Sequence, residues 1–341
     1  MAAPHHLIIL DGGMGHLLRR HGVAIEGPIG SMQRFLGVAL ANTTQPELVR
    51  ACHREYLAAG AAIITTNSYS CVPAALELAS DGGSDSSDLV AASISAAGAR
   101  AREARDAFVA AASLGAAAEP RIAGCVPPLH ESYRADRVGS SDELAAAYAH
   151  IVAKIAPHSD LLLCETMSSA REAFAAARAS VESGSGKPVW ISYTLHDDAS
   201  GRLRSGETIG EAVRAIDSLL IRVDDGSAAA RRRGTVEAIL LNCCSHASIC
   251  TALPALRHAL DELGAPGAAV RIGAYANGFK TVEAGAEMAG AEAEYIDLSP
   301  ADYAMQARQY VELGASIVGG CCGVFPEHIA AVKETLLPQL S

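Results

Sequence analysis

The chain has 341 residues, half of them hydrophobic, and its 27 basic and 38 acidic side chains give a formal net charge of −11. This composition predicts a large buried core, excludes a disordered chain, and argues against a nucleic-acid binder, which needs a basic surface. No apolar run reaches the roughly 20 residues of a membrane-spanning helix, and the run at 7–10 is too short for a signal peptide. Nine cysteines are too sparse for a disulfide scaffold, so we expect reduced thiols and a cytoplasmic location.

Short apolar runs alternate along the chain with amphipathic or alanine-rich stretches. The predicted strands lie at 7–10, 61–66, 121–126, 160–164, 188–194, 236–242, 270–275 and 315–319. Continuous apolar runs of this length are typical of parallel strands buried on both faces. A helix is predicted over 46–59, where Pro46 opens the first turn and Gly60 follows the end, and a last helix begins near Pro326.

Eight strand–helix units predict a single (β/α)₈ barrel of the TIM type over residues 1–341. Polar stretches rich in glycine, serine or charge at 80–88, 183–187 and 224–234 are predicted loop insertions in this domain. A doubly wound open sheet is the alternative, because hydrophobic periodicity does not distinguish it from a barrel. In a barrel, catalytic residues lie at the C-terminal ends of the strands. Polar residues follow several predicted strands: Asp11, Thr66-Asn67, Glu165, Asn242-Cys243-Cys244, Asn277 and Cys321-Cys322.

The cysteines at two of these strand ends suggest a metal site. Cys321 and Cys322 are flanked by glycines after the eighth strand, and Cys243 and Cys244 follow the sixth. Strands six and eight both neighbour strand seven in a barrel, so three thiolates can converge there. Three protein ligands would leave the fourth position of a tetrahedral zinc site open for substrate. Alternation turns only one of Cys243 and Cys244 inward, and the competing interpretation is that all these cysteines are structural core.

Other candidate residues have weaker signals. His53 lies beside the apolar stripe of its helix and is expected to pack there, whereas His328 is expected to be exposed. His246 is a metal-ligand candidate by residue type alone. The segment that starts at Gly12 lacks the G-x-G-x-x-G spacing of a dinucleotide-binding loop.

Several segments together resemble the homocysteine S-methyltransferase family. The matching segments occur in the family's order: Asp11-Gly12-Gly13-Met14-Gly15, 53–69, Glu165-Thr166-Met167, Ser192-Tyr193-Thr194, Leu241-Asn242-Cys243, Gly319-Gly320-Cys321-Cys322-Gly323 and Pro326-Glu327-His328-Ile329. The glycine–cysteine segment with its downstream Pro-Glu-His-Ile is highly specific. The chain departs from the family at Cys125-Val126-Pro127-Pro128, at Tyr275-Ala276-Asn277-Gly278, and around Phe35, where a common tryptophan is missing. These departures concern the side of the methyl donor more than the metal.

The resemblance implies a TIM-type barrel that holds catalytic zinc through Cys243, Cys321 and Cys322. It also implies that Asp11 and Glu165 orient substrate by holding the amino group of homocysteine. The backbone around Gly12 and Thr66 would meet the substrate carboxylate, and Asn242 completes the expected substrate-binding set. Tyr133 is a candidate contact of the donor.

We therefore expect zinc-dependent transfer of a methyl group from an onium donor to homocysteine, giving methionine. S-methylmethionine is the first choice of donor and S-adenosylmethionine the second, whereas betaine-dependent relatives carry a longer C-terminal extension. Thiolate ligands preserve the nucleophilicity of a zinc-bound thiol, which fits thiol alkylation better than water activation. The alternatives are transfer to another thiol or a selenol such as selenocysteine, an inactive zinc-binding or redox-responsive barrel, and a barrel aldolase or hydrolase. The expected partners are small molecules, with no nucleic acid and no membrane, and the oligomeric state is left open.

Overall fold

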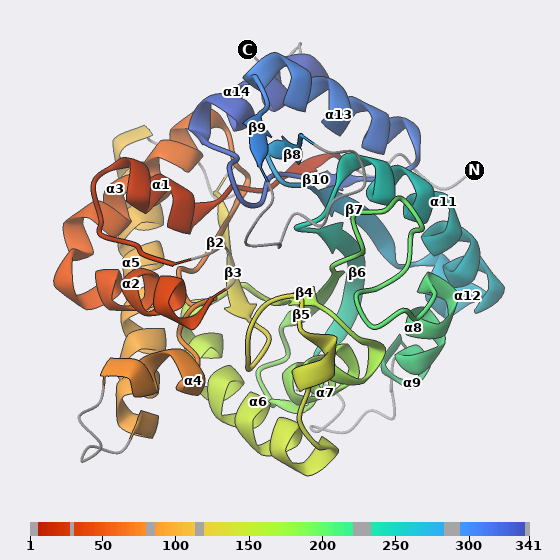
Figure 1. Cartoon of the computed structure of the whole chain (residues 1–341), viewed down its shortest axis with the longest axis horizontal. Helices are drawn as coiled ribbons and strands as arrows, with labels where there is room; N and C mark the ends of the chain where they lie inside the picture. Colours follow the sequence, from red (N-terminus) through yellow and green to blue (C-terminus); the bar gives the residue numbers. More distant parts are fainter. Residues whose placement is uncertain are drawn as a thin grey trace.

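The computed structural model describes residues 6–27, 31–79, 86–112, 119–220, 233–282 and 294–337. Eight parallel strands form a ring that helices surround (Figure 1). The strands are β1 (Ile8–Ile9), β2 (Ile63–Thr65), β3 (Arg121–Val126), β4 (Leu161–Met167), β5 (Pro188–Tyr193), β6 (Thr235–Asn242), β7 (Arg271–Tyr275) and β10 (Ile317–Val318). Their spatial order is β1-β10-β7-β6-β5-β4-β3-β2, and a parallel bridge between Leu10 and Ile63 joins β1 to β2. This closure confirms the predicted (β/α)₈ barrel and excludes the open sheet.

The helices follow the strands in the alternating pattern of the fold. They are α1 (Met14–Arg20), α2 (Met32–Thr44), α3 (Pro46–Ala59), α4 (Pro73–Leu76), α5 (Ser86–Ala112), α6 (Ser141–Ile155), α7 (Ala170–Glu182), α8 (Ile209–Ala215), α9 (Asp217–Leu220), α11 (His246–Glu262), α12 (Ala265–Ala268), α13 (Pro300–Glu312) and α14 (Pro326–Leu336). Helix α3 has the predicted bounds: Pro46 opens it, and Gly60 ends it with a φ of 103°, a backbone angle that favours glycine. None of the described helices is long and apolar enough to cross a membrane.

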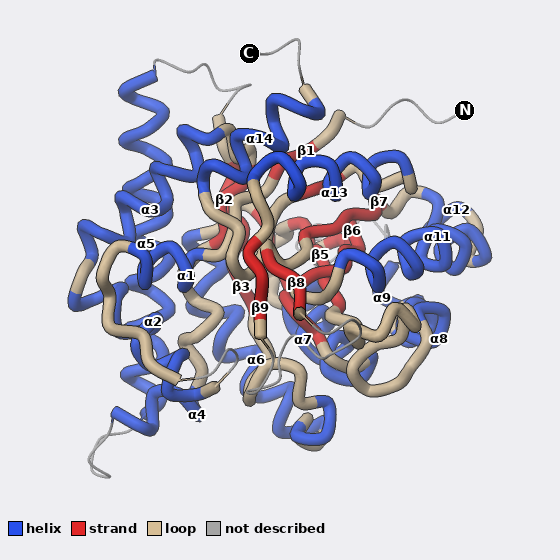
Figure 2. Tube along the Cα trace, turned by 45° about the horizontal axis from the view of Figure 1, so that its top comes forward, coloured by secondary structure: helices blue, strands red, loops and turns tan. Residues whose placement is uncertain are grey.

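A short antiparallel pair interrupts the strand–helix alternation after β7. It consists of β8 (Phe279–Thr281) and β9 (Tyr295–Asp297) and lies across one end of the barrel (Figure 2). The Gly278 N–H donates to the Cys322 carbonyl at 2.7 Å, which holds the pair against the cysteine segment. The sequence analysis did not predict this pair.

Two layers of core hold the barrel together. The inner cluster contains Leu10, Ile63, Ala123, Leu161, Leu163, Trp190, Ala238, Leu240, Tyr275 and Ile317. Residues between these positions, such as Leu162 and Ile239, pack outward in the larger cluster that includes the helices. Side chains of a strand alternate between faces, so the register of the inner cluster decides which residues point into the barrel at its C-terminal end.

Some predicted boundaries differ from the structure. Glu165 was expected after the fourth strand, but it lies inside β4, where the pairing with β5 shifts between Cys164 and Met167. Strands β1 and β10 are shorter than their apolar runs, since few of those residues make ladder hydrogen bonds. The predicted loop at 183–187 is present between α7 and β5. Most of the predicted loops at 80–88 and 224–234 lies outside the described residues.

Candidate active site

A layer of polar side chains covers the apolar centre of the barrel. Continuing the alternation by two residues from Leu163 and from Leu240 places Glu165 and Asn242 in this layer. The hydroxyl of Tyr275 donates to Glu165 Oε1 at 3.1 Å, and the thiol of Cys125 donates to Glu165 Oε2 at 3.2 Å. The fold therefore builds the polar layer from strands that are far apart in the sequence.

Three cysteines meet next to this layer. The sulfur atoms of Cys243, Cys321 and Cys322 all lie within 4.8 Å of one another, and the Cys243 and Cys322 sulfurs are 3.7 Å apart. A tetrahedral zinc ion with bonds of about 2.3 Å to sulfur requires a sulfur–sulfur separation of about 3.8 Å. The donor set and its spacing thus fit a thiolate-bound metal. This is the cysteine set that the sequence resemblance implied.

Cys243 reaches the cluster because the chain turns sharply where β6 ends. Strand alternation alone would aim Cys244 inward after Asn242, but Cys243 has a φ of 53°. Thr166 and Tyr133 also have positive φ values, of 60° and 68°. Such angles are unfavourable for residues other than glycine, and here they gather around one site, as strained backbone commonly does at functional sites.

Asn242 supports the cysteine cluster through contacts of its side-chain amide. Its amide nitrogen donates to the Thr166 hydroxyl at 2.8 Å and contacts the Cys321 sulfur at 3.8 Å. Its amide oxygen accepts from the Ser192 hydroxyl at 2.8 Å. Asn242 is fully buried and is not among the residues that line the cavity described below. Its contacts therefore fit the positioning of Cys321 better than the expected contact with substrate.

Asp11 and Glu165 form a pair of buried acids. Asp11 accepts from the Thr65 N–H at 2.7 Å and from the Thr65 hydroxyl at 3.0 Å. Burial raises the pKa of Asp11 to about 8 despite these hydrogen bonds, and the nearby Glu165 charge adds to the rise. Burial likewise raises the pKa of Glu165 to about 7. Two acids held in this way favour a bound cation, which stabilises both ionised forms.

One cavity of about 140 Å³ connects the acids with the cysteines. Asp11, Glu165 and all three cysteines line it, as do Gly12 and Thr66. The lining also includes the aromatic residues Phe35, Tyr69, Tyr133 and Tyr275 and the basic residues His16 and Arg34. Seven of the predicted site residues therefore face the same space, and only Asn242 does not.

Close backbone approach explains the glycines that border the cavity. A Cβ atom on Gly13 would lie 2.6 Å from the Cys321 carbonyl oxygen, and one on Gly12 would lie 2.4 Å from the Val324 carbonyl oxygen. The segment after β1 can therefore pack directly on the cysteine segment only because side chains are missing there. The backbone of Thr66 is less open to ligand, since its N–H donates to the Ala123 carbonyl at 2.9 Å.

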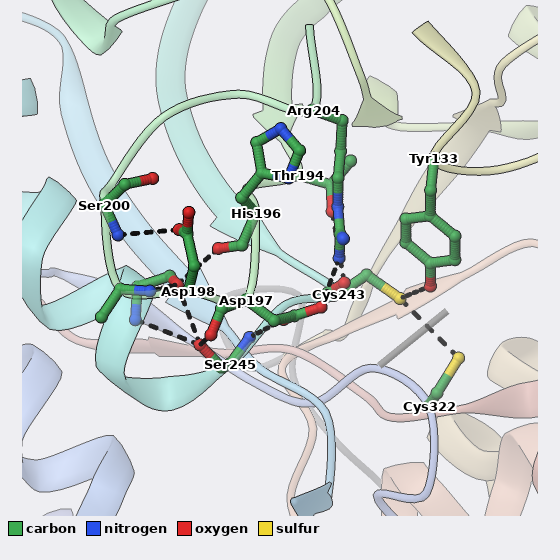
Figure 3. A network of polar contacts seen from close by, with 12 residues as sticks. Tyr133, Thr194, His196, Asp197, Asp198, Ser200, Arg204, Cys243, Ser245 and Cys322 are labelled. Atoms are coloured by element: carbon green, nitrogen blue, oxygen red, sulfur yellow. Dashed lines mark hydrogen bonds and ion pairs between the residues drawn. The ribbon is translucent and has the colours of Figure 1, made fainter. Parts of the chain in front are cut away.

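A buried ion pair connects the loops that surround Cys243 (Figure 3). Arg204 pairs with Asp197 at 2.7 Å, and the two side chains are 4% and 1% exposed. The Arg204 guanidinium lies 4.8 Å from the centre of the Tyr133 ring, and the Tyr133 hydroxyl lies 3.0 Å from the Cys243 sulfur. Asp197 also accepts from the Ser245 N–H at 2.6 Å, just beyond the cysteines that end β6. The network thus holds Tyr133 and the Cys243 turn together.

The remaining candidates lie away from the cysteines. Cys244 is buried and outside the cluster, and burial raises the pKa of its thiol. His246 contacts the Tyr310 hydroxyl at 3.0 Å, and His53 is buried within α3 as expected. The expectation of an exposed His328 is wrong: it is 5% exposed, and it accepts from the Phe325 N–H at 3.2 Å in the first turn of α14.

The sequence analysis missed His16, Arg34 and the Asp197–Arg204 pair. Arg34 lies at the start of α2 and Arg204 in the loop between β5 and α8, where no periodic pattern indicates burial. The only sequence signal near Arg34 was the absence of a tryptophan around Phe35.

Comparisons with known proteins agree with the fold and identify the family. The family model described as homocysteine S-methyltransferase matches residues 8–336. Homocysteine S-methyltransferases 4 and 3 of Zea mays are each 24% identical over 96% of this chain, and the matches cover 89% and 90% of those relatives. The metallated form of the homocysteine methyltransferase MmuM from Escherichia coli aligns with a TM-score of 0.72 at 24% identity, over 97% of this chain and 96% of that chain. The oxidized form of MmuM aligns with a TM-score of 0.71 at 25% identity, over 96% of this chain and 95% of that chain.

The chain belongs to the homocysteine S-methyltransferase family, because the family model spans almost all of it. It is a methyltransferase that transfers a methyl group to homocysteine.

Proposed function

We propose that this enzyme is zinc-dependent, transfers a methyl group from S-methylmethionine to homocysteine and releases methionine, with S-adenosylmethionine as a second donor. The observation that carries the proposal is the convergence of three cysteine sulfurs on the cavity that two buried acids also line. In the reaction a new bond forms between the homocysteine sulfur and the methyl carbon. The carbon–sulfur bond of the sulfonium breaks, and its electron pair stays on the leaving thioether.

Cys243, Cys321 and Cys322 would hold the zinc ion through their sulfur atoms. When bound, zinc supplies a site at which the substrate thiol loses its proton near neutral pH. Three thiolates and one divalent ion carry a formal charge of about −1, so this site also attracts a cationic donor. The Cys321–Asn242 and Cys243–Tyr133 contacts fix two of the sulfurs before substrate arrives.

Asp11 and Glu165 would bind the ammonium group of homocysteine. An ammonium between the two carboxyl groups favours their ionised forms, and so offsets the burial and the smaller repulsion from Glu165 that raise the pKa of Asp11. Charge-assisted hydrogen bonds then fix the amino acid at one end, which places its sulfur beside the cysteines. Gly12 lets the segment after β1 pack against the Val324 carbonyl, which keeps Asp11 close to the cysteine segment.

The onium group of the donor would face the aromatic side of the cavity. Phe35 and Tyr69 pack edge to face with their ring centres 5.5 Å apart, and both line the cavity with Tyr133. Aromatic faces attract sulfonium and ammonium cations through their ring charge distribution. The reduced cysteines that this chemistry needs also support a cytoplasmic location.

The test is a transfer assay with zinc-loaded protein, homocysteine deuterated along its carbon chain, and S-methylmethionine. Labelled methionine then reports transfer to the acceptor, while unlabelled methionine reports the demethylated donor, and the two should form in equal amounts. A parallel reaction contains S-adenosylmethionine, and the Cys322→Ala variant is the control without the intact cysteine set. Zinc-loaded protein that forms no labelled methionine from either donor contradicts the proposal. Faster turnover of a selenol than of homocysteine would instead favour the alternative acceptor.

A further inference from the structure

Arg34 is a buried cation inside the catalytic cavity. It lies in the first turn of α2, is 6% exposed, and lines the cavity together with the three cysteines. Its guanidinium contacts the Gly27 carbonyl at 3.5 Å and His16 Nε2 at 3.2 Å. Among the described residues it forms no ion pair with a carboxylate. A buried arginine normally has an anionic partner, so this side chain has capacity for one.

His16 does not supply that anion. Burial and the adjacent Arg34 charge lower the pKa of His16 to about 4. The imidazole is therefore neutral at physiological pH and accepts a hydrogen bond from the Arg34 guanidinium. This contact orients the guanidinium but brings no negative charge to it.

Arg34 lies on the cysteine side of the cavity rather than beside the two acids. Its guanidinium contacts His16, whose ring stacks on Phe279, and Phe279 borders Gly323 next to Cys322, whereas Asp11 is held by Thr65 at the end of β2. The ammonium and carboxylate of homocysteine are attached to one carbon atom, so an amino group between Asp11 and Glu165 keeps its carboxylate near them. An anion at Arg34 must therefore belong to the other substrate.

We propose that Arg34 binds the carboxylate of the methyl donor and thereby restricts the donors to onium compounds that carry a carboxylate. The inference rests on the proposed function and adds a substrate class to it. A donor that has a carboxylate places it on Arg34 and its onium group toward the cysteines. A donor without a carboxylate leaves Arg34 unpaired and brings a second positive charge beside it. The same arginine therefore favours donors that have a carboxylate and disfavours donors that lack one.

The experiment compares S-methylmethionine with trimethylsulfonium, a methyl donor without a carboxylate, in zinc-loaded wild-type protein and in Arg34→Ala. Loss of the charge-assisted bond should raise the KM for S-methylmethionine about 10- to 100-fold. The KM for homocysteine should stay within about twofold, and the KM for trimethylsulfonium should stay the same or fall. Arg34→Lys should restore part of the affinity for S-methylmethionine, because it keeps the charge but loses the bidentate geometry.

Arg19→Ala is the matched control, since Arg19 is exposed on α1 and its charge acts on Arg34 without lining the cavity. Arg19→Ala should leave the KM values for S-methylmethionine and trimethylsulfonium unchanged. Calorimetric titration of S-methylmethionine into zinc-loaded protein without homocysteine gives a readout that needs no turnover. A loss of donor binding there supports the inference even if transfer to homocysteine fails.

Three results would overturn the inference. A larger KM for homocysteine alone would assign Arg34 to the acceptor carboxylate. An equal rise in KM for both donors, or a loss of bound zinc, would mean that Arg34 only balances the charge of the thiolates. Unchanged binding of S-methylmethionine would remove the role altogether. Should Arg34→Ala not fold, Arg34→Gln makes the same comparison with a side chain of similar length.

Discussion

At the scale of single residues, the site depends on a turn that strand geometry does not predict. Leu240 and Asn242 face the barrel interior in alternation, and the next inward position would be Cys244. The positive φ of Cys243 redirects the chain, so the sulfur of Cys243 joins those of Cys321 and Cys322. The neighbouring Cys244 becomes an ordinary core residue. Two adjacent cysteines thus have different environments because of one backbone angle.

This difference predicts opposite effects of two alanine substitutions. Cys243→Ala should lower the affinity for zinc by more than about 100-fold, since even changes to residues behind the ligands cost 10- to 100-fold. Cys244→Ala removes only a buried sulfur and should cost about 1 kcal/mol of stability with zinc retained. The amount of zinc that remains per protein chain after gel filtration shows whether each variant retains the metal. Zinc loss in Cys244→Ala together with retention in Cys243→Ala would reverse the ligand assignment.

The acid pair predicts a pH dependence of homocysteine binding. The pKa values of Asp11 and Glu165 are raised to about 8 and about 7, so both groups gain protons as the pH falls below these values. A protonated acid no longer pairs with the ammonium, and the KM for homocysteine should rise several-fold between pH 8 and pH 6.

Steady-state kinetics at saturating donor measure this rise, and Glu165→Gln is the control. The variant should have a higher KM at pH 8 and a weaker dependence on pH, because one titrating group is gone. A wild-type KM that is constant from pH 6 to pH 8 would show that the acids do not bind the ammonium.

The sequence predicted the residues with distinctive chemistry better than those with distinctive surroundings. Cysteines between glycines and acids at strand ends are visible in the sequence, and the structure brings them to one cavity. The burial of Arg34 depends on how α1, α2 and the segment around Gly27 pack, which no local pattern records. His328 was misassigned for a similar reason, since its ring contacts the Leu298 carbonyl, which belongs to a distant segment.

At the scale of elements, the loop between β5 and α8 is tied to the end of β6. The loop folds back on itself through the bridge between Leu195 and Leu203. Asp197 and Arg204, on its two sides, form the buried ion pair, and Asp197 extends the connection to Ser245 at the start of α11. This loop therefore stabilises both its own hairpin-like shape and the Cys243 turn.

Breaking that ion pair should destabilise the protein strongly. Asp197→Asn removes the negative charge of this buried pair and should cost about 3–5 kcal/mol in the free energy of unfolding. Urea denaturation measures the loss, and Asp198→Asn, at the exposed neighbouring position, is the control with little expected change. The double variant Asp197→Leu with Arg204→Met should lose less than Asp197→Asn alone, because no buried charge remains. An equal or larger loss in the double variant would contradict this account.

Elements were predicted from the sequence where periodicity is strong and missed where it is short. The apolar runs identified all eight barrel strands, and α3 has its predicted bounds. The irregular end of β4, which carries Glu165, and the β8–β9 pair were not predicted. Both depend on hydrogen bonds to other segments rather than on their own residues.

At the scale of the whole molecule, the core that folds the barrel is largely separate from the cysteine cluster at its mouth. The inner cluster runs through the strands, and the outer cluster packs the helices on them. Of the three cysteines, only Cys321 contacts the inner cluster, from its edge. The fold therefore does not depend on metal for its core, in contrast to small domains that unfold without zinc.

This separation predicts a limited effect of metal removal. A metal that binds only the native state adds stability through mass action, about 2.7 kcal/mol at 100 times the Kd. Chelation should therefore lower the Tm by a few degrees, while the far-UV circular dichroism of the barrel persists. The Cys322→Ala variant should melt at the same temperature with and without chelator, because it has no intact site to empty. If chelation instead abolished the far-UV signal of the wild type, the cysteine cluster would be part of the folding core, and the substitutions that test its catalytic role would report unfolding.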